Sequence, residues 1–342
     1  MTRDDRGMGS AHTGLYPSIE PYESGCIAVD GGNSVYWEMC GNPAGMPALF
    51  LHSGPGGGCS PNNRRLFDPD RYRILLFDQR GCGRSRPHAG TKPDLRANTT
   101  AHLISDMELL RQTFGIGRWL LLGGSWGATL ALAYAQAYPD CVSAMVLRGV
   151  FTARQSELRW LYGDGAASLF PEAWERFNAP IPEAERGDLV RAYHARLMGG
   201  GQGTQVEARA ATVAARAWCA WEDDIMTLMP DCPAEAARDA RQDELSLLAL
   251  ARIEAHYLVN KAFLEEGQLI ANAHRLSRIP GVIVQGRYDA VTPAATAFEL
   301  HKAWPRAQLQ IVPDAGHASS EPGILRRLVA ATDAFACAHE QY

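Results

Sequence analysis

The stretch WLLLGGSWGATLALAY, residues 119–134, places one serine between glycines at the junction of two different sequence patterns. Before Ser125 the chain is continuously apolar, as in a strand buried on both faces, and after it an alanine- and leucine-rich run indicates a buried helix. Gly123 and Gly127 complete a G-x-S-x-G pattern, typical of a tight turn that projects a nucleophilic hydroxyl above a sheet. We predict that Ser125 is a nucleophile. The alternative is a Gly-Ser turn that only caps the following helix.

Further apolar runs on both sides of this stretch alternate with helix-like segments. Such alternation predicts an α/β fold with a mostly parallel, doubly wound sheet and helices on both faces. The strand-like runs are ALFLH (48–52), RILLFD (73–78), WLLLGG (119–124), SAMVLRG (143–149), GVIVQG (281–286) and LQIVPD (309–314).

The strand-like rhythm stops between residues 151 and 276, where amphipathic segments rich in tryptophan and alanine replace it. Ser125 and Asp289 are 164 positions apart, whereas two βα units of roughly 30 residues each need only about 60 to 80. We therefore expect an inserted helical cap, with MGGGQG (198–203) as a flexible loop inside it. The predicted division is a disordered tail at 1–14, an α/β core at 15–150 and 277–342, and a helical cap at 151–276.

Composition limits the classes of partner. The 342 residues include 33 basic and 38 acidic side chains, a formal net charge of −5 with no basic block, so neither nucleic acid nor a membrane surface is an expected partner. The eight cysteines are scattered without a CxxC pair, which favours reduced thiols in a cytoplasmic protein over disulfides or a zinc site. The polar start lacks the apolar segment of a signal peptide, and no run reaches the roughly 18 apolar residues of a membrane span.

A serine nucleophile needs a base, and the base needs an acid that orients it. Asp289 and His317 each follow a strand-like run, at the edge where ligands bind in open α/β sheets. The chain order of serine, acid and histidine is also the one expected for such a sheet. We predict a triad of Ser125, Asp289 and His317, and interpret the rival acid Asp314 as a turn residue. The histidines interpreted as surface or core residues are His256, His274 and His301.

The oxyanion formed by nucleophilic attack needs preplaced N–H donors. The expected donors are the backbone N–H groups of Trp126, directly after the nucleophile, and of Gly54 in the glycine-rich loop HSGPGGG (52–58). FDQRGCGRS (77–85) is interpreted as a structural turn braced by its own polar side chains. A phosphate-binding loop is not indicated, since neither G-x-G-x-x-G nor a G-K-[ST] ending is present. We predict a mechanism without metal or cofactor.

A series of motifs covering nearly the whole chain resembles the proline iminopeptidases, serine peptidases of the α/β-hydrolase fold. These motifs occur in the order LYPSIEPYESG (15–25), GNPAGMPALFLHSGPGGG (41–58), DQRGCGRS (78–85), GGSWGATLALAYAQAYP (123–139), LRGVF (147–151), FPEAWERF (170–177), WCAWE (218–222), ARIEAHY (251–257), GRYDAVTP (286–293) and DAGH (314–317).

The resemblance implies an aminopeptidase that releases N-terminal proline through an acyl-enzyme intermediate. By the same resemblance, Glu222 and Glu254 match cap carboxylates that hold the free amino end of a small peptide or amide substrate. Carboxylates in a partly desolvated pocket distinguish a charged amine from an internal amide, because unmatched buried charges are costly. Phe151 and Tyr162 resemble part of the pocket for the proline ring.

Three positions depart from the pattern of the family. Ser53 replaces a glycine and would be strained if its φ were positive. Thr292 stands where a cysteine is common. Leu258 stands where an aromatic residue is usual, and we expect the loss of that aromatic to make the proline pocket wider or flatter. Two other functions stay open at this point, an amide or ester hydrolase of a specialised pathway and a non-catalytic binding protein. The sequence does not indicate an oligomeric state.

Overall fold

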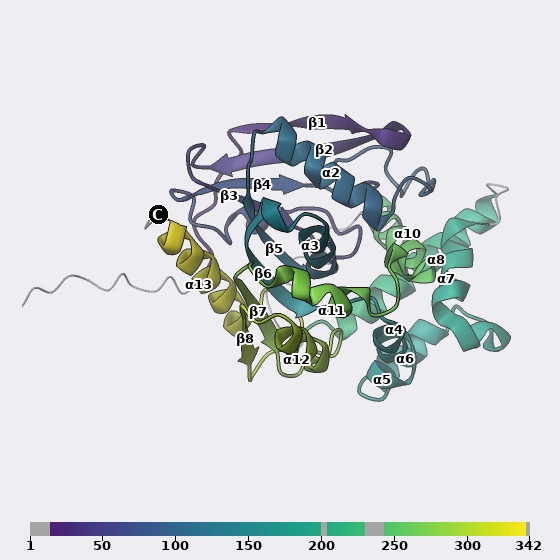
Figure 1. The fold of residues 1–342 in the computed structure, drawn as a ribbon. Helices are drawn as coiled ribbons and strands as arrows, with labels where there is room; N and C mark the ends of the chain where they lie inside the picture. Colours follow the sequence, from purple (N-terminus) through teal and green to yellow (C-terminus); the bar gives the residue numbers. More distant parts are fainter. Residues whose placement is uncertain (1–13, 200–203, 230–242, 340–342) are drawn as a thin grey trace, which may run out of the picture.

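The computed structural model describes residues 14–199, 204–229 and 243–339. Its centre is an eight-stranded sheet in the order β1-β2-β4-β3-β5-β6-β7-β8 (Figure 1). The predicted tail at 1–14 and the loop at 198–203 lie outside the described residues, except for Gly14, Met198 and Gly199. The strands are β1 (Glu23–Val29), β2 (Asn33–Gly41), β3 (Met46–Leu51), β4 (Tyr72–Phe77), β5 (Trp119–Ser125), β6 (Val142–Val150), β7 (Gly281–Gly286) and β8 (Ala307–Val312).

The six predicted strand-like runs correspond to β3 through β8, which are mutually parallel. The antiparallel hairpin β1–β2 extends one edge of the sheet. Sequence analysis did not predict it, because side chains of β1 alternate between exposed and half-buried positions instead of forming an apolar run. The predicted α/β fold is confirmed, and the hairpin adds two strands to it.

Helices cover both faces of the sheet. Successive side chains of a strand point to opposite faces and therefore pack into two different hydrophobic cores. Leu49 and Leu51 pack in one core with α2, α3 and α12, whereas Ala48 and Phe50 pack in the other with α13. The helices and turns of this part are η1 (Asp30–Gly32), α1 (Pro61–Arg64), α2 (Thr100–Thr113), α3 (Trp126–Ala137), η2 (Pro139–Cys141), α12 (Ala294–Ala303) and α13 (Pro322–His339).

Between β6 and β7, the described residues form helices and turns but no strands. Figure 1 shows α4, α5, α6, α7, α8 and α10 gathered at one end of the sheet, whereas α11 lies beside α3 and α12. The cap boundaries at 151 and 276 stay a prediction. The elements of this segment are α4 (Gln155–Tyr162), α5 (Asp164–Ala167), α6 (Pro171–Asn178), η3 (Glu183–Asp188), α7 (Leu189–Met198), α8 (Gln205–Asp224), α10 (Glu244–Val259), η4 (Lys261–Phe263), α11 (Gln268–Ala271) and η5 (Asn272–Leu276).

Side-chain caps fix the starts of the two longest helices in this segment. At α8, Thr204 accepts a hydrogen bond from the backbone N–H of Glu207, whose carboxylate accepts one from the backbone N–H of Thr204. At α10, Asp243 accepts from the backbone N–H of Ser246 at 2.7 Å. Each cap satisfies N–H groups that have no partner within the helix. The two caps thereby fix the residue at which each helix begins, and with it the positions of Glu222 on α8 and Glu254 on α10.

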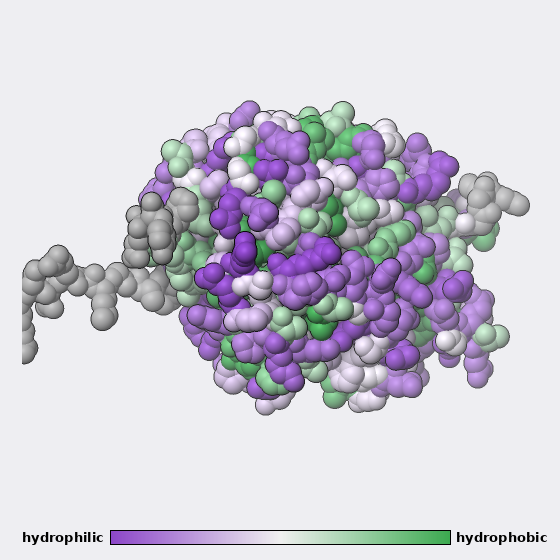
Figure 2. All heavy atoms as spheres, viewed as in Figure 1, coloured by the Kyte–Doolittle hydropathy of each residue, from purple (hydrophilic) through white to green (hydrophobic). Residues whose placement is uncertain are grey.

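The outer surface is mostly hydrophilic in the view of Figure 2, with hydrophobic residues interspersed among polar ones. Across the described ranges, no helix combines the length and apolar character that a membrane crossing requires. The seven cysteines in the described part of the chain are all free thiols.

Candidate active site

Ser125 lies at the end of β5, where the strand turns directly into α3. Its φ of 55° and ψ of −121° are unusual for a residue with a side chain, and such conformations cost about 1–3 kcal/mol. Both flanking glycines are required by close packing. A Cβ on Gly123 would lie 2.4 Å from the carbonyl oxygen of Gly127, and a Cβ on Gly127 would lie 2.2 Å from that of Leu51. The turn therefore depends on the G-x-S-x-G glycines.

His317 and Asp289 form a buried pair on the loops that follow β8 and β7. His317 Nδ1 lies 2.8 Å from Asp289 Oδ2. The other carboxylate oxygen, Oδ1, accepts the backbone N–H groups of Val291 at 3.0 Å and Thr292 at 2.7 Å. Burial alone would raise the pKa of Asp289, but the charge of His317 and these hydrogen bonds outweigh it and hold the pKa below its usual value. The carboxylate is thus kept ionised beside the imidazole.

The side chain of Thr292 also contacts both members of the His317–Asp289 pair. Its hydroxyl donates to Asp289 Oδ2 at 2.9 Å and lies 3.1 Å from His317 Nδ1. The side-chain amide of Gln285 donates to the same carboxylate oxygen at 2.9 Å. Gly149, with a φ of 53°, makes room for the ring, since a Cβ there would lie 2.7 Å from His317 Cε1. The Thr292 hydroxyl thus helps to hold the Asp289 carboxylate in place.

The loop predicted to supply an oxyanion donor passes beside the serine turn. Gly54 has a φ of 120°, and a Cβ on it would lie 2.5 Å from the backbone nitrogen of Gly56. Gln79 connects this loop to the turn. Its backbone N–H donates to His52 Nε2, and its side-chain oxygen accepts from Trp126 Nε1, both at 2.9 Å. The turn interpreted as structural therefore also braces the loop that carries Gly54.

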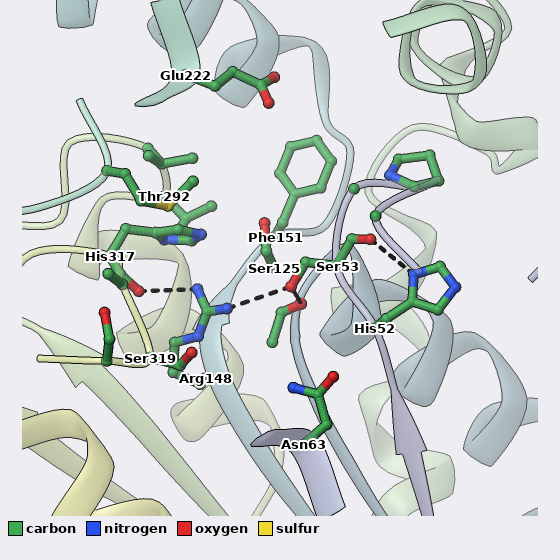
Figure 3. Close-up of a pocket in the computed structure, with 18 of the residues that line it drawn as sticks. His52, Ser53, Asn63, Ser125, Arg148, Phe151, Glu222, Thr292, His317 and Ser319 are labelled. Atoms are coloured by element: carbon green, nitrogen blue, oxygen red, sulfur yellow. Dashed lines mark hydrogen bonds between the residues drawn. The ribbon is translucent and has the colours of Figure 1, made fainter. Parts of the chain in front are cut away.

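Ser53, one of the departures from the family pattern, lies outside the positive-φ region. The strain that a positive φ would cause does not arise. Its hydroxyl donates to the carbonyl oxygen of Gly124 at 3.0 Å and accepts from Arg148 Nη2 at 3.4 Å (Figure 3). Arg148 Nη1 in turn donates to the carbonyl oxygen of His317 at 2.9 Å. Ser53 and Arg148 together connect the glycine-rich loop, the serine turn and the histidine loop.

These loops and the cap surround one cavity of about 590 Å³. Figure 3 shows Ser125 near its middle, with Glu222 on the cap side. Asp289 lies behind His317, and the Trp126 side chain is buried against Gln79. The other predicted site residues all line the cavity, namely Gly54, Ser125, Phe151, Tyr162, Glu222, Glu254 and His317.

The two predicted cap carboxylates approach the cavity from different helices. Glu222, near the end of α8, accepts a hydrogen bond of 2.5 Å from the Tyr162 hydroxyl. Glu254, on α10, is only 4% exposed and accepts from Trp218 Nε1 at 2.7 Å. Burial, followed by the charges of both glutamates, raises the pKa of Tyr162 well above its usual value. Two acidic side chains therefore lie close to one tyrosine hydroxyl.

Aromatic side chains pack around the end of the cavity that contains Glu222 and Glu254. The rings of Tyr162 and Trp218 stack with centroids 4.7 Å apart. Phe151, directly after β6, and Leu258, on α10, line the cavity and are each 7% exposed. The space next to the carboxylates is thus apolar on several sides, and Leu258 contributes an aliphatic surface to it.

Hydrogen bonds connect the segment after α8 to the histidine loop. The carbonyl oxygen of Met226 accepts the backbone N–H groups of His317 and Ala318, each at 3.0 Å. The Glu321 carboxylate accepts the backbone N–H groups of Leu228 at 2.8 Å and Gly316 at 2.6 Å. Burial raises the pKa of Glu321. The chain that follows Glu222 is therefore attached directly to the loop that carries His317.

Two polar residues at this site were not predicted. Arg148 lies near the carboxyl end of the strand-like run SAMVLRG, so its place near a strand end was an available signal. Glu321 gave no such signal, because its role depends on two backbone N–H groups from distant parts of the chain. Both residues hold loops on which predicted catalytic residues lie.

The model of the alpha/beta hydrolase fold family matches residues 47–323. Proline iminopeptidases of Xylella fastidiosa and Xanthomonas citri are each 50% identical to this chain, over 94% of it and 99% of their own lengths. The chain belongs to the proline iminopeptidase family. The family resemblance inferred from the motifs is confirmed, and the chain is a hydrolase.

A relative from a plant is equally similar in sequence, and two solved structures share the fold. A proline iminopeptidase of Arabidopsis thaliana is 50% identical over 93% of this chain and 81% of its own length. A proline iminopeptidase-related protein of Thermus thermophilus has a TM-score of 0.57 at 22% identity, covering 94% of this chain and 97% of its own. An esterase of a Rhodococcus species has a TM-score of 0.59 at 20% identity, covering 94% and 99%. Both structures are similar in fold.

Proposed function

We propose that this enzyme releases N-terminal proline from short peptides, with Ser125 as nucleophile and an acyl-enzyme as intermediate. The names of the relatives support the reaction. The observation that carries the proposal is that one cavity contains both the Ser125–His317 side chains and two cap carboxylates, Glu222 and Glu254. A hydrolase that acts on neutral esters has no need for acidic side chains at the buried end of its site.

In the proposed reaction, His317 accepts the proton of the Ser125 hydroxyl as Oγ attacks the prolyl carbonyl carbon. The backbone N–H groups of Gly54 and Trp126 stabilise the resulting oxyanion. His317 then gives the proton to the leaving amine, the carbon–nitrogen bond breaks, and the prolyl group remains esterified to Ser125. Water then attacks this ester with His317 again as base, the ester bond to Oγ breaks as His317 returns the proton to Ser125, and free proline leaves. Asp289 keeps the imidazole oriented and stabilises its charged form.

Substrate selection in this proposal depends on charge. The protonated imino group of an N-terminal proline pairs with Glu222 and Glu254, where partial exclusion of water strengthens the interaction. The ring then lies among the apolar surfaces of Phe151, Tyr162 and Leu258. An internal peptide bond would place a neutral amide against both carboxylates, leaving their desolvation uncompensated. The site therefore favours substrates with a free N-terminal amine.

A panel of aminoacyl arylamides tests the proposed function. The prolyl compound is expected to have a kcat/KM at least about tenfold higher than the alanyl, leucyl and glutamyl compounds, a difference of about 1.4 kcal/mol. A panel in which another residue is preferred would contradict proline specificity. If no aminoacyl arylamide is cleaved while simple esters are, the chain is an ester hydrolase on the same scaffold.

A further inference from the structure

The cavity has two unlike ends on opposite sides of Ser125. At the cap end, Glu254 is 4% exposed, and Tyr162 and Leu258 are 7% exposed each. At the other end, cavity-lining side chains such as Asn62 and Ser319 are exposed. Figure 3 places Glu222 on one side of Ser125 and Asn63 on the other, with Arg148 between. The part of the cap end around Glu254 is therefore enclosed, although Asp223 is exposed at its margin, and the other end reaches the solvent at Asn62 and Ser319.

The open end has its own surface chemistry. Leu66, Leu325 and Leu328 line it, and the polar groups beside them are neutral, such as those of Asn63 and Ser319. The acidic side chains that line the cavity among the described residues, Glu222, Asp223 and Glu254, all come from α8 and α10 in the cap. Among the described residues that line the cavity, Arg148 is the one arginine or lysine, and Figure 3 shows its guanidinium on the same side of Ser125 as Asn63.

We infer that the open end is the subsite for the residue that follows the N-terminal proline, and that it selects an apolar side chain at this position. The inference rests on the proposed function. If the proline occupies the cap end and its carbonyl carbon lies at Ser125, the rest of the peptide continues past Arg148 toward Leu66 and Leu325. An aliphatic side chain there loses contact with water against leucines, which is favourable.

A positively charged side chain at the same position is disfavoured for two reasons. Its ammonium group would lose hydration against the leucine side chains without gaining a carboxylate partner. It would also lie on the same side of Ser125 as the Arg148 guanidinium, and like charges repel. The subsite therefore disfavours a positively charged group, whereas the cap end is proposed to bind one.

The dipeptide amides prolyl-norleucinamide and prolyl-lysinamide isolate this effect, because their side chains have the same carbon skeleton and only the lysine carries a charge. The enzyme is expected to hydrolyse the norleucine compound with a kcat/KM at least about tenfold higher. Values within twofold of each other would overturn the inference. This comparison uses the unmodified enzyme and does not depend on a variant folding.

A variant tests the position of the subsite. Leu325 is half-buried on α13, and Leu325→Glu places a carboxylate beside the side chain of the second residue. The variant is expected to raise the lysine-to-norleucine ratio of kcat/KM about tenfold. Leu169→Glu is the matched control, because Leu169 is exposed on the cap surface and does not line the cavity. An unchanged ratio in a folded Leu325→Glu variant would overturn the assignment.

Prolinamide separates this inference from the function on which it rests. Its leaving group is ammonia, which is too small to reach the leucines of the open end. Cleavage of prolinamide with equal hydrolysis of the two dipeptide amides would retain the proposed function and overturn the subsite. Failure to cleave prolinamide and both dipeptide amides would overturn both.

Discussion

Ser125 is held in a strained backbone conformation by two neighbouring glycines. The φ of 55° at this residue is tolerated because Gly123 and Gly127 allow the strand, the turn and Leu51 to approach within distances that a Cβ would prevent. Strain of this kind persists where the surrounding structure enforces it, and it is concentrated at functional sites. The need for glycine at both positions was predictable from the sequence, whereas the contact with Leu51 was not.

At the level of single residues, the proposed triad predicts a large loss of turnover on removal of the nucleophile. Ser125→Ala is expected to fold normally and to lose activity on prolyl arylamide by a factor on the order of 10⁶, as in other triad hydrolases. His317→Ala is expected to be comparably inactive. Ser105→Ala, an exposed serine on α2, is the control and should retain full activity. Activity of Ser125→Ala within tenfold of the parent would rule out the assignment.

The depressed pKa of Asp289 predicts a pH-dependent contribution to stability. Its pKa is lower in the folded chain than in the unfolded chain, where it is about 3.9. The carboxylate therefore stabilises the fold above that value, and the contribution is lost as pH falls through the lower folded pKa. The difference in unfolding free energy between the parent and Asp289→Asn should be largest at neutral pH and should shrink in acid. A difference that stays constant between neutral pH and about pH 3 would contradict this account.

At the level of elements, the parallel strands were predictable because each is a short apolar run buried on both faces. The antiparallel hairpin of β1 and β2 was not, since an edge strand with one exposed face has no comparable pattern. The positions of Asp289 and His317 after β7 and β8 followed from the strand order alone. The positions of Glu222 and Glu254 did not, because a glutamate on a helix is ordinarily a solvated residue, and only the family resemblance indicated otherwise.

The attachment of the segment after α8 to the histidine loop predicts a structural effect of Glu321. Glu321→Ala leaves the N–H groups of Leu228 and Gly316 without their acceptor, at about 1–3 kcal/mol for each buried group. We expect urea denaturation to show a loss of about 2–4 kcal/mol in unfolding free energy, with a smaller loss in Glu321→Gln, which keeps one acceptor oxygen.

The control for this experiment is Glu185→Ala, which removes an exposed carboxylate that pairs with Arg196. Surface pairs of this kind contribute about 1 kcal/mol or less. If Glu321→Ala loses no more stability than Glu185→Ala, the hydrogen bonds of Glu321 do not hold the two segments together.

At the scale of the whole molecule, the proposed site lies where the helices inserted between β6 and β7 meet the sheet. The sheet supplies Ser125, Asp289 and His317, and helices inserted between β6 and β7 supply both carboxylates. The chemistry of the first group follows from local sequence patterns at strand ends. The positions of the two carboxylates depend on how helices that are distant in sequence pack over the strand ends. Local patterns in a single sequence do not determine this packing.

The measurement that tests the central claim most directly compares free prolyl arylamide with its N-acetyl derivative, in the parent and in Glu254→Gln. Acetylation removes the positive charge that Glu222 and Glu254 are proposed to bind, and desolvated charge pairs of this kind are worth roughly 2–5 kcal/mol, or about 30-fold to several thousand-fold in kcat/KM. The account predicts that the free compound is preferred by such a factor. It also predicts that Glu254→Gln weakens hydrolysis of the free compound while hardly changing hydrolysis of p-nitrophenyl acetate. Equal hydrolysis of free and acetylated compounds, or equal losses on amide and ester in the variant, would contradict it.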